Sequence, residues 1–490
     1  MKFISRRRFI QNSSLLTGGF FTLPLLTLAG GREKEKHNFT LVKGKVESNG
    51  KGIPQISVSD GKYIYRTDSY GNFEFSTDQP FVFFTYPAGY RFNVLENGSV
   101  DFFKKLDYRE NLNQVNFYLN PNPYSEEEHH FIAMADPQVQ TEEEANSFIR
   151  ESCSDLIKTK IALNDSNLFG VGLGDLVFDQ FELFEQYNKG IRSTGIPFFQ
   201  VLGNHDIDLM ARSNESGQYP FTNLYGPPYF SFNRGKRHYI VLSDVYFLGN
   251  KQYYGYLSET QLKWLEQDLE SVDKGSEVVL FLHIPSYSKV VENNPGRDIN
   301  KETVINRMAL YDLLKDYKTH LISGHVHWNE NTVKDTVFEH NTAAISGAWW
   351  VADICYDGTP RGYGVYKSKD DLSWYYQSIG KEKSFQFRTY PPGDHPDFPE
   401  EYCINVWNWD PLWKVGWKED GAYQGEARRE TSHDPLAIQI FNQRGSEVKH
   451  PWISAQRTDH LFFFKPNSPY SNLEIEVSDR FGNLYLEKLN

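Results

Sequence analysis

The sequence predicts an α/β protein whose central part is flanked by two β-rich regions. Between about residues 131 and 364, short apolar runs typical of buried strands alternate with longer runs of helical periodicity, which predicts a sheet covered by helices. Residues 39–120 instead alternate apolar and polar side chains in short runs. After about Pro391 the helical periodicity stops and β-like patterns return. A chain of 490 residues is long enough for two or three domains.

The first region reads as a small antiparallel β-sandwich. Runs such as 41–46 and 72–78 have the alternation of half-buried strands, and turn signals at 48–50 and 69–72 separate them from their neighbours. The pattern is similar to that of carboxypeptidase-regulatory-like or related immunoglobulin-like accessory domains. Because no catalytic set occurs there, we expect this domain, residues 38–122, to have a structural or docking role.

The central part has four runs with helical periodicity. In the clearest of them, Ser258 and Gln261 have the spacing of a capping box, and Leu262, Leu265 and Leu269 follow at the spacing of one helix face. The other three runs are 142–164, 179–193 and 303–317.

The last region, residues 391–490, is expected to be a β-rich domain. Residues 461–464 and 473–477 read as strands, and 479–483 read as a hairpin turn. No internal repeat and no low-complexity tract interrupts this three-part organisation.

Five short segments of the central part carry carboxylate, amide and imidazole side chains, and most of them follow a run that reads as a buried strand. Groups at the ends of adjacent strands converge on one point. A pair of divalent ions about 3.5–4 Å apart needs such a donor set, with one carboxylate bridging. The segments are Asp136-Pro137-Gln138, Gly174-Asp175, Gly203-Asn204-His205-Asp206, His283 and Gly324-His325-Val326-His327.

In this order the segments resemble the motifs of the calcineurin-like metallophosphoesterase family, D-x-H, G-D, G-N-H-[DE], a lone histidine and G-H-x-H. One position departs from the pattern, because Gln138 stands where the family usually has histidine, a D-x-Q variant. The resemblance covers about residues 131–364. It implies a four-layer α/β/β/α sandwich as the catalytic domain, residues 128–390. The β domain on each side resembles the arrangement in a bacterial branch of the family.

The resemblance also implies how two divalent metal ions are bound. Asp175 is the expected bridging ligand, because the two oxygens of a carboxylate can each reach one cation. The other implied ligands are Asp136 and His327 for the first metal, and Asn204, His283 and His325 for the second.

Gln138 has two possible roles at the first metal. Its amide oxygen either replaces the imidazole as a ligand or hydrogen-bonds a metal-bound water. Oxygen is a harder donor than imidazole nitrogen, so the first role favours Mn²⁺, Mg²⁺ or iron over Zn²⁺. Of these we expect Mn²⁺.

His205 follows the ligand Asn204 and is not itself assigned as a ligand. In the family this histidine faces the substrate phosphate and assists the leaving group, and its ordinary pKa near 6.5 suits proton transfer. Asp206 is the expected partner that orients it. The family's frequent aspartate three residues after the bridging one is absent, since Phe178 stands there and Asp179 comes one later.

Trp349, Trp350 and Arg361 resemble the segment that closes the catalytic domain in the same bacterial branch. Arg361 is a candidate for contact with the substrate phosphate, and the tryptophans are candidates for stacking on a base or sugar. Packing at a domain interface is the alternative for all three.

The N-terminus and the charge bear on location and partners. Residues 5–11, SRRRFIQ, look like a twin-arginine export signature, and the apolar stretch that follows is broken by glycine and proline before a cleavage site near Ala29. We therefore expect residues 1–29 to be a signal peptide that engages the twin-arginine export machinery and sends the protein to the periplasm; a membrane anchor is the alternative. The net charge of −13 argues against nucleic-acid binding.

Together these features predict an exported phosphoester hydrolase with two metal ions. The resemblance implies that a hydroxide bridging the metals attacks phosphorus in line while His205 acts as general acid. The substrate is expected to be a small-molecule, glycan or lipid phosphoester. A phosphodiesterase and a catalytically degenerate binding protein of the cell envelope are the alternatives.

Overall fold

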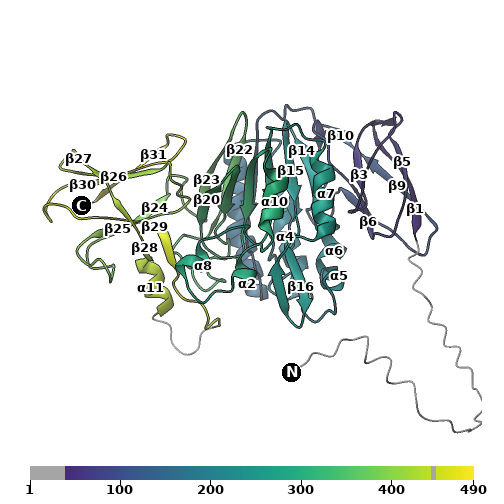
Figure 1. The fold of residues 1–490 in the computed structure, drawn as a ribbon. Helices are drawn as coiled ribbons and strands as arrows, with labels where there is room; N and C mark the ends of the chain where they lie inside the picture. Colours follow the sequence, from purple (N-terminus) through teal and green to yellow (C-terminus); the bar gives the residue numbers. More distant parts are fainter. Residues whose placement is uncertain (1–38, 443–448, 490) are drawn as a thin grey trace, which may run out of the picture. The chain divides into compact units, whose positions relative to one another are not determined.

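Two sheets packed face to face form the central part of the computed structural model, which describes residues 39–442 and 449–489 (Figure 1). The expected signal peptide, residues 1–29, lies outside the described residues. The first sheet has the strand order β13-β12-β11-β22-β23. Strands β13, β12 and β11 are parallel to one another, while β22 is antiparallel to both of its neighbours, β11 and β23. Its strands are β11 (His129–Met134), β12 (Phe169–Gly172), β13 (Phe198–Gln200), β22 (Gly362–Ser368) and β23 (Leu372–Ser378).

The second sheet has the strand order β14-β15-β18-β19-β21-β20. Strands β15, β18, β19 and β21 are parallel, and an antiparallel strand closes each edge. The strands are β14 (Phe230–Arg234), β15 (Arg237–Val241), β18 (Glu277–Phe281), β19 (Lys318–Ser323), β20 (Glu330–Lys334) and β21 (Val337–Asn341).

Successive side chains of β11 point to opposite faces of the first sheet and show how the layers pack. Phe131 faces the second sheet, where its ring centroid lies 5.6 Å from that of Tyr239 and 5.7 Å from that of Phe281. Ile132 and Met134 point the other way, into a core with the helices that cover the first sheet.

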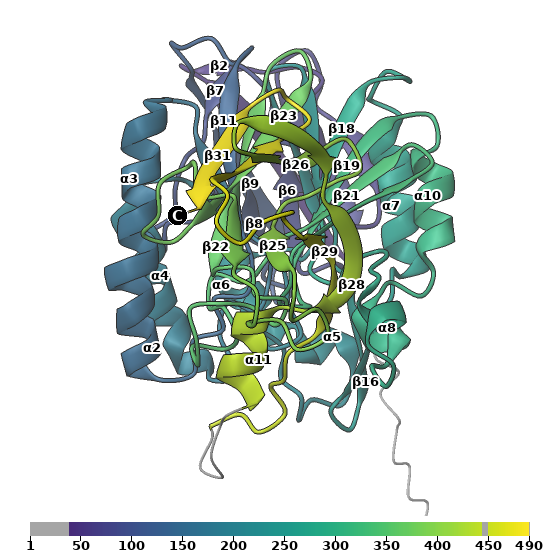
Figure 2. The same cartoon turned by 90° about the vertical axis from the view of Figure 1, so that its left-hand side faces the viewer.

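Helices therefore lie outside both sheets, on opposite sides in Figure 2, which confirms the predicted four-layer α/β/β/α sandwich. The run 142–164 is one helical segment with a π-helical turn in its middle. The covering helices are α2 (Glu142–Ser147), η1 (Phe148–Cys153), α3 (Ser154–Leu163), η2 (Phe181–Leu183) and α4 (Phe184–Thr194) on the first sheet, and α7 (Glu259–Leu269) and α10 (Arg307–Leu314) on the second.

Only half of the expected capping box forms at α7. The Ser258 hydroxyl accepts a hydrogen bond from the Gln261 N–H (3.3 Å). The Gln261 amide does not reach back, because it pairs with the N–H and C=O of Ser243 instead. This pairing ties α7 to the end of β15.

The N-terminal region contains two four-stranded sheets and packs closely on the central part. The expectation of a purely antiparallel arrangement is wrong at one place, because the first and last strands of one sheet, 40–48 and 112–118, pair in parallel. The rings of Phe102 and Phe230 lie 4.1 Å apart, and the Trp264 Nε1–H donates to Ser59 Oγ (3.1 Å). The strands are β1 (Thr40–Ser48), β2 (Lys51–Gly52), β5 (Asn72–Thr77) and β9 (Leu112–Tyr118); β3 (Ser57–Ser59), β4 (Ile64–Arg66), β6 (Phe81–Phe84) and β8 (Phe103–Lys105); and the pair β7 (Tyr90–Arg91) and β10 (Asn120–Pro121).

The C-terminal region has two antiparallel four-stranded sheets, and the turn predicted at 479–483 joins β30 to β31. The prediction that helical structure ends before this region is wrong, because residues Pro435–Asn442 form the helix α11. Asp434 immediately precedes this helix, and its carboxylate accepts a hydrogen bond from a backbone N–H of the first turn. The strands are β24 (Phe387–Tyr390), β25 (Tyr402–Val406), β28 (Arg428–His433) and β29 (Arg457–Phe464), then β26 (Lys414–Glu419), β27 (Ala422–Glu426), β30 (Leu473–Ser478) and β31 (Leu484–Leu489).

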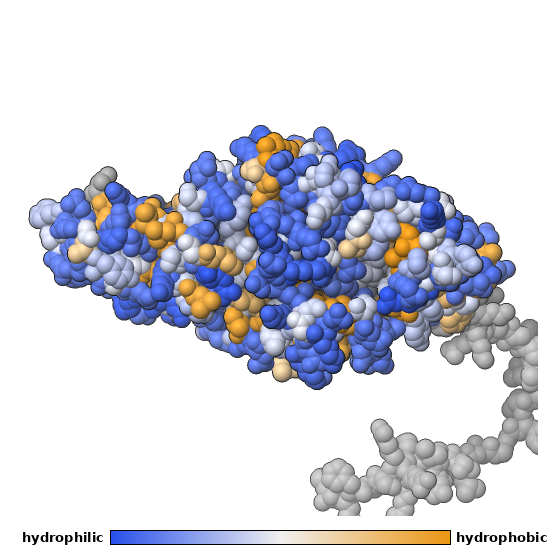
Figure 3. Space-filling view, turned by 90° about the horizontal axis from the view of Figure 1, so that it is seen from above, coloured by the Kyte–Doolittle hydropathy of each residue, from blue (hydrophilic) through white to orange (hydrophobic). Residues whose placement is uncertain are grey.

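Short elements lie before and between the strands of the second sheet, and two of their residues contact His325: the Tyr253 ring lies 6.3 Å from the His325 ring, and Lys301 O lies 3.0 Å from His325 Nε2. In residues 39–442 and 449–489 no helix has both the length and the apolar character needed to cross a membrane. The surface seen in Figure 3 is mostly hydrophilic, with separate small apolar groups. The short elements are α5 (Asn214–Gly217), α6 (Tyr219–Tyr225), β16 (Val245–Gly249), β17 (Gln252–Gly255), α8 (Val290–Asn293) and α9 (Ile299–Glu302).

Candidate metal centre

Both sheets bring their motif residues to the same edge. Asp136, Asp175 and Asn204 follow β11, β12 and β13 of the first sheet, while His283 and His325 follow β18 and β19 of the second. Ligand atoms of Asp175, His283 and His325 lie within 4.8 Å of one another. The convergence predicted from strand ends is therefore present, across two sheets rather than one.

The backbone at these strand ends is strained. Asp136, Gln138, Asp175, His325 and His327 all have a positive φ, between 41° and 73°. Non-glycine residues rarely adopt this conformation, and such strain clusters at functional sites.

Glycines in the motifs allow the segments to approach closely. A Cβ on Gly203 would lie 2.0 Å from the backbone nitrogen of Asp175, and one on Gly324 would lie 2.7 Å from Asp136 Oδ2. Any side chain at these two positions would push the carboxylates out of place.

One group of donors surrounds the His283 ring. Its Nε2 lies 3.1 Å from Asn204 Oδ1, 3.3 Å from Asp175 Oδ1 and 3.2 Å from His325 Nδ1. All four side chains are buried or nearly so. The arrangement matches the ligand set expected for the second metal.

A second group consists of buried polar atoms that lack a hydrogen-bond partner among the described residues: Asp136 Oδ1, Gln138 Oε1 and His327 Nε2. The His327 and Asp136 atoms are 3.9 Å apart. An unsatisfied buried polar atom costs about 1–3 kcal/mol, so three together need a common partner. A divalent cation is such a partner, and this is the group expected around the first metal.

Asp175 and Gln138 connect the two groups. The Gln138 Nε2–H donates to Asp175 Oδ2 (2.7 Å), while Asp175 Oδ1 faces His283. The two carboxylate oxygens thus point to different groups, as a bridging ligand requires. With its nitrogen on Asp175, the Gln138 side chain keeps its buried amide oxygen without a hydrogen-bond partner among the described residues.

Each histidine of the centre has its other ring nitrogen on a backbone carbonyl. His283 Nδ1 donates to Leu173 O (2.7 Å), His327 Nδ1 to Gly347 O (2.8 Å) and His325 Nε2 to Lys301 O (3.0 Å). This second hydrogen bond fixes the tautomer that leaves a lone pair for a metal ion. The donor set therefore fits divalent cations.

The pKa shifts of the buried carboxyl and imidazole groups also fit a metal site. Burial, and then the neighbouring Asp175, raise the pKa of Asp136 to about 8. Burial would also raise the pKa of Asp175, but His283 and His205 hold it well below its ordinary value. Burial lowers the pKa of His327 to about 3 and keeps the ring neutral. Burial would lower the pKa of His283, but the neighbouring Asp175 raises it to about 10. Near neutrality Asp136 and His283 therefore hold protons, and metal ions would displace these protons and supply the positive charge in their place.

The structure corrects the expected partner of His205. The His205 Nδ1 atom lies 2.9 Å from Asp179 Oδ1, and its ring stacks on Phe178 at 4.1 Å. Asp206 does not orient this ring, because its carboxylate accepts hydrogen bonds from three backbone N–H groups, those of Leu176, Val177 and Gly203. Asp206 therefore holds the two motif loops together.

Arg361 does not face the site either. Its guanidinium pairs with Glu151 and with Asp353, and only 8% of the residue is exposed. The pairing with Glu151 could not be foreseen, because Glu151 is 210 positions away in the sequence. Arg361 therefore forms structural ion pairs in place of the predicted contact with the substrate phosphate.

The two tryptophans have different positions. The Trp350 Nε1–H donates to Pro137 O (2.8 Å), so this ring braces the first motif. The Trp349 ring lies 5.6 Å from His327 and 5.9 Å from His205. Only Trp349 remains a candidate for substrate contact.

Sequence reasoning missed two further polar residues close to the centre. The Arg297 guanidinium donates to Glu302 (2.8 Å), whose carboxylate lies 3.9 Å from His325 Nε2. Their segment has no motif of its own, so only the fold reveals that it covers the second group.

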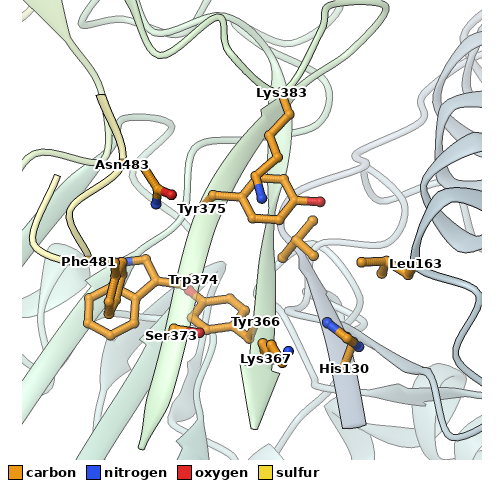
Figure 4. A pocket seen from close by; sticks show the side chains of 11 residues that line it. His130, Leu163, Tyr366, Lys367, Ser373, Trp374, Tyr375, Lys383, Phe481 and Asn483 are labelled. Carbon is orange, nitrogen blue, oxygen red and sulfur yellow. The ribbon is translucent and has the colours of Figure 1, made fainter. Parts of the chain in front are cut away.

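A cavity of about 380 Å³ lies elsewhere, against β22 and β23 (Figure 4). His130, Trp374, Tyr375, Lys383 and Phe481 are among its lining residues. It contains none of the motif residues, so it is separate from the candidate metal centre.

The fold and the donor set are those of a metallophosphoesterase. The family model "Calcineurin-like phosphoesterase" matches residues 129–329, and the models for the N terminal and the C terminal of calcineurin-like phosphoesterase match residues 40–122 and 339–485. The chain belongs to the calcineurin-like phosphoesterase family, with both accessory regions.

Individual relatives are distant. Purple acid phosphatase 13 of Arabidopsis thaliana is 27% identical over 141 residues, 26% of this chain, and the chain spans only 24% of that relative's length. Two solved structures are matched with low scores. Purple acid phosphatase PPD1 from yellow lupin (Lupinus luteus) seeds is 12% identical, with 70% of this chain and 72% of that chain covered and a TM-score of 0.37. GAP50, the anchor in the inner membrane complex of Plasmodium, is 13% identical, with 51% of this chain and 84% of that chain covered and a TM-score of 0.33.

Proposed function

We propose that the protein hydrolyses phosphoesters with two divalent cations bound at the candidate metal centre. The observation that carries the proposal is the pair of donor groups joined by Asp175, one of them made of buried atoms without another partner. Bound cations would supply an activated water and neutralise charge that builds up on the phosphoryl oxygens. The residues proposed to hold them are Asp136, Gln138, Asp175 and His327 for the first, and Asp175, Asn204, His283 and His325 for the second.

His205 is proposed to protonate the leaving group. With Nδ1 on Asp179, its Nε2 is free to donate toward a substrate. Burial would lower the pKa of His205, but Asp175 and Asp179 raise it above its ordinary value. The raised pKa favours the protonated ring, which is the form that a general acid needs.

The identity of the metals is part of the proposal. The amide oxygens of Gln138 and Asn204 are hard donors, which favours Mn²⁺, Mg²⁺ or iron over Zn²⁺, and of these we propose Mn²⁺.

Hydrolysis by the full chain is the direct test of this function. p-Nitrophenyl phosphate and bis-p-nitrophenyl phosphate should be compared, since they separate a monoesterase from a diesterase. Wild type should hydrolyse at least one after loading with Mn²⁺, and Asp175→Asn should not. Asp312→Asn, which removes an exposed carboxylate on α10, is the control and should match wild type. A folded, metal-loaded wild type without activity on either ester would instead favour a degenerate binding protein.

Export through the twin-arginine route is a second, independent proposal, supported by the SRRRFIQ segment alone. Arg6→Lys with Arg7→Lys should leave the precursor in the cytoplasm, while Arg8→Lys should not. Normal periplasmic accumulation of the double variant would contradict it.

A further inference from the structure

Aromatic side chains from two regions of the chain meet beside His205. We call Phe178, Trp349, His450 and Trp452 the aromatic wall. Trp349 lies 4.9 Å from Phe178, 5.1 Å from His450 and 5.2 Å from Trp452 between ring centroids. The wall begins at the His205 ring, which stacks on Phe178, and ends at Trp452, which is 55% exposed.

The C-terminal part of the wall is fixed to the catalytic domain. Lys449, next to His450, forms an ion pair with Glu144 of α2. His450 is buried and lies 5.9 Å from Phe178. Trp349 is set by the turn that also places the Trp350 Nε1–H on Pro137 O. The wall is therefore held in position relative to the candidate metal centre.

Trp452 is exposed although it contacts two aromatic neighbours of the wall. Aromatic faces beside a catalytic site stack on flat rings of many kinds, because every such ring has a π-face. His450 and Trp349 contact the Trp452 ring, at interplanar angles of 52° and 73° respectively. Neither is stacked on it face to face.

We propose that the aromatic wall binds the leaving group of the substrate, and that the preferred substrates are phosphoesters of a planar ring, such as an aryl group or a nucleobase-bearing alcohol. This inference rests on the proposed function. In the reaction, water releases a proton to solvent and adds its oxygen to phosphorus, and the bond from phosphorus to the ester oxygen breaks. That oxygen keeps the electron pair and takes a proton from His205, which solvent then reprotonates. The departing group must then lie on the His205 side, where the wall stands.

The test compares two esters whose leaving groups have similar acidity, phenyl phosphate and the ringless hexafluoroisopropyl phosphate. For Trp452→Ala the ratio of kcat/KM, phenyl over hexafluoroisopropyl, should fall about tenfold, mostly through a higher KM, the size expected for loss of one stacking partner. Trp452→Phe should restore most of the ratio. Tyr470→Ala removes an aromatic side chain that is 93% exposed, and as the control it should leave the ratio unchanged.

Three results would overturn the inference. Equal losses on both esters would mean that Trp452 only supports the fold. An unchanged ratio accompanied by a change in oligomeric state would assign Trp452 to a contact between chains. Metal-loaded wild type that hydrolyses neither ester, nor p-nitrophenyl phosphate, nor bis-p-nitrophenyl phosphate would overturn the proposed function itself, which a change in the ratio for a wall variant does not.

Discussion

The Nδ1 atom of His205 lies 2.9 Å from Oδ1 of Asp179, and in the proposed mechanism this pair orients the ring for proton transfer. The carboxylate fixes the imidazole in one tautomer and leaves Nε2 as the nitrogen that can reach a substrate. Asp179 stands one position later than the family pattern suggests, and the fold brings it to the ring nevertheless.

Asp179→Asn should reduce turnover by about 10- to 100-fold with both metals retained, because loss of an orienting partner typically has this cost. Asp206→Asn is the contrasting variant. It weakens the carboxylate that binds three backbone N–H groups, so it should lower the melting temperature and the metal content as well. Turnover, metal analysis and thermal unfolding of both variants distinguish the two roles; identical behaviour would contradict them.

His205→Ala should reduce turnover by about 10²–10⁴-fold while both metals remain bound. The loss should be smaller for p-nitrophenyl phosphate than for alkyl phosphates, since a stable phenolate leaves without a proton. Rates for a series of leaving groups, with metal analysis of the same samples, provide the measurement. A uniform loss would mean that His205 stabilises the phosphoryl oxygens only, and loss of metal would mean that it is a ligand.

Gln138→Ala should weaken binding of the first metal by about 10- to 100-fold and leave the second unchanged. Gln138→His should shift the preference toward Zn²⁺, because imidazole is the softer donor. Titration of each variant with Mn²⁺ and Zn²⁺ measures both effects, with the exposed Gln114→Ala as control. If both variants bind metals as wild type does, Gln138 is not a ligand.

His129 should make the fold sensitive to acid. Burial lowers its pKa from 6.5 to about 4, and its ring nitrogens contact Glu126 O and the Tyr239 hydroxyl. Between these pKa values the unfolded chain binds a proton that the folded chain excludes. The free energy of unfolding therefore falls as the pH drops through this window, by up to about 1.4 kcal/mol per pH unit and about 3 kcal/mol in all, and is unaffected above it.

Denaturant unfolding at several pH values checks this for wild type and His129→Gln. The variant should lose stability less steeply below pH 6.5. Parallel curves for the two proteins would show that His129 is not responsible.

Much of the central fold could be predicted because its signals are local. The apolar runs before Asp136, Asp175 and His283 are strands, and the alternation of Phe131 with Ile132 follows from strand geometry. The helix α11 was missed because residues 435–442 are too few for a clear periodicity next to strand-like sequence.

At the site, the directions of the side chains were harder to predict than their identities. Motif order identified which residues meet, but not where their side chains point. Asp206 adjoins His205 in sequence, yet its carboxylate turns to the backbone, and Asp179 reaches the ring from 26 residues away. Arg361 is committed to Glu151, a partner that only the folded chain brings near.

Metal analysis of purified wild type and Asp175→Ala, with circular dichroism to confirm that both are folded, is the decisive measurement for the proposed dinuclear centre. We expect two divalent ions per wild-type chain, because a dinuclear centre needs both. Asp175→Ala should lose both ions and the phosphoesterase activity with them, since each ion loses a ligand. A variant that keeps two ions, or a wild type that hydrolyses phosphoesters after complete removal of metal, would contradict it.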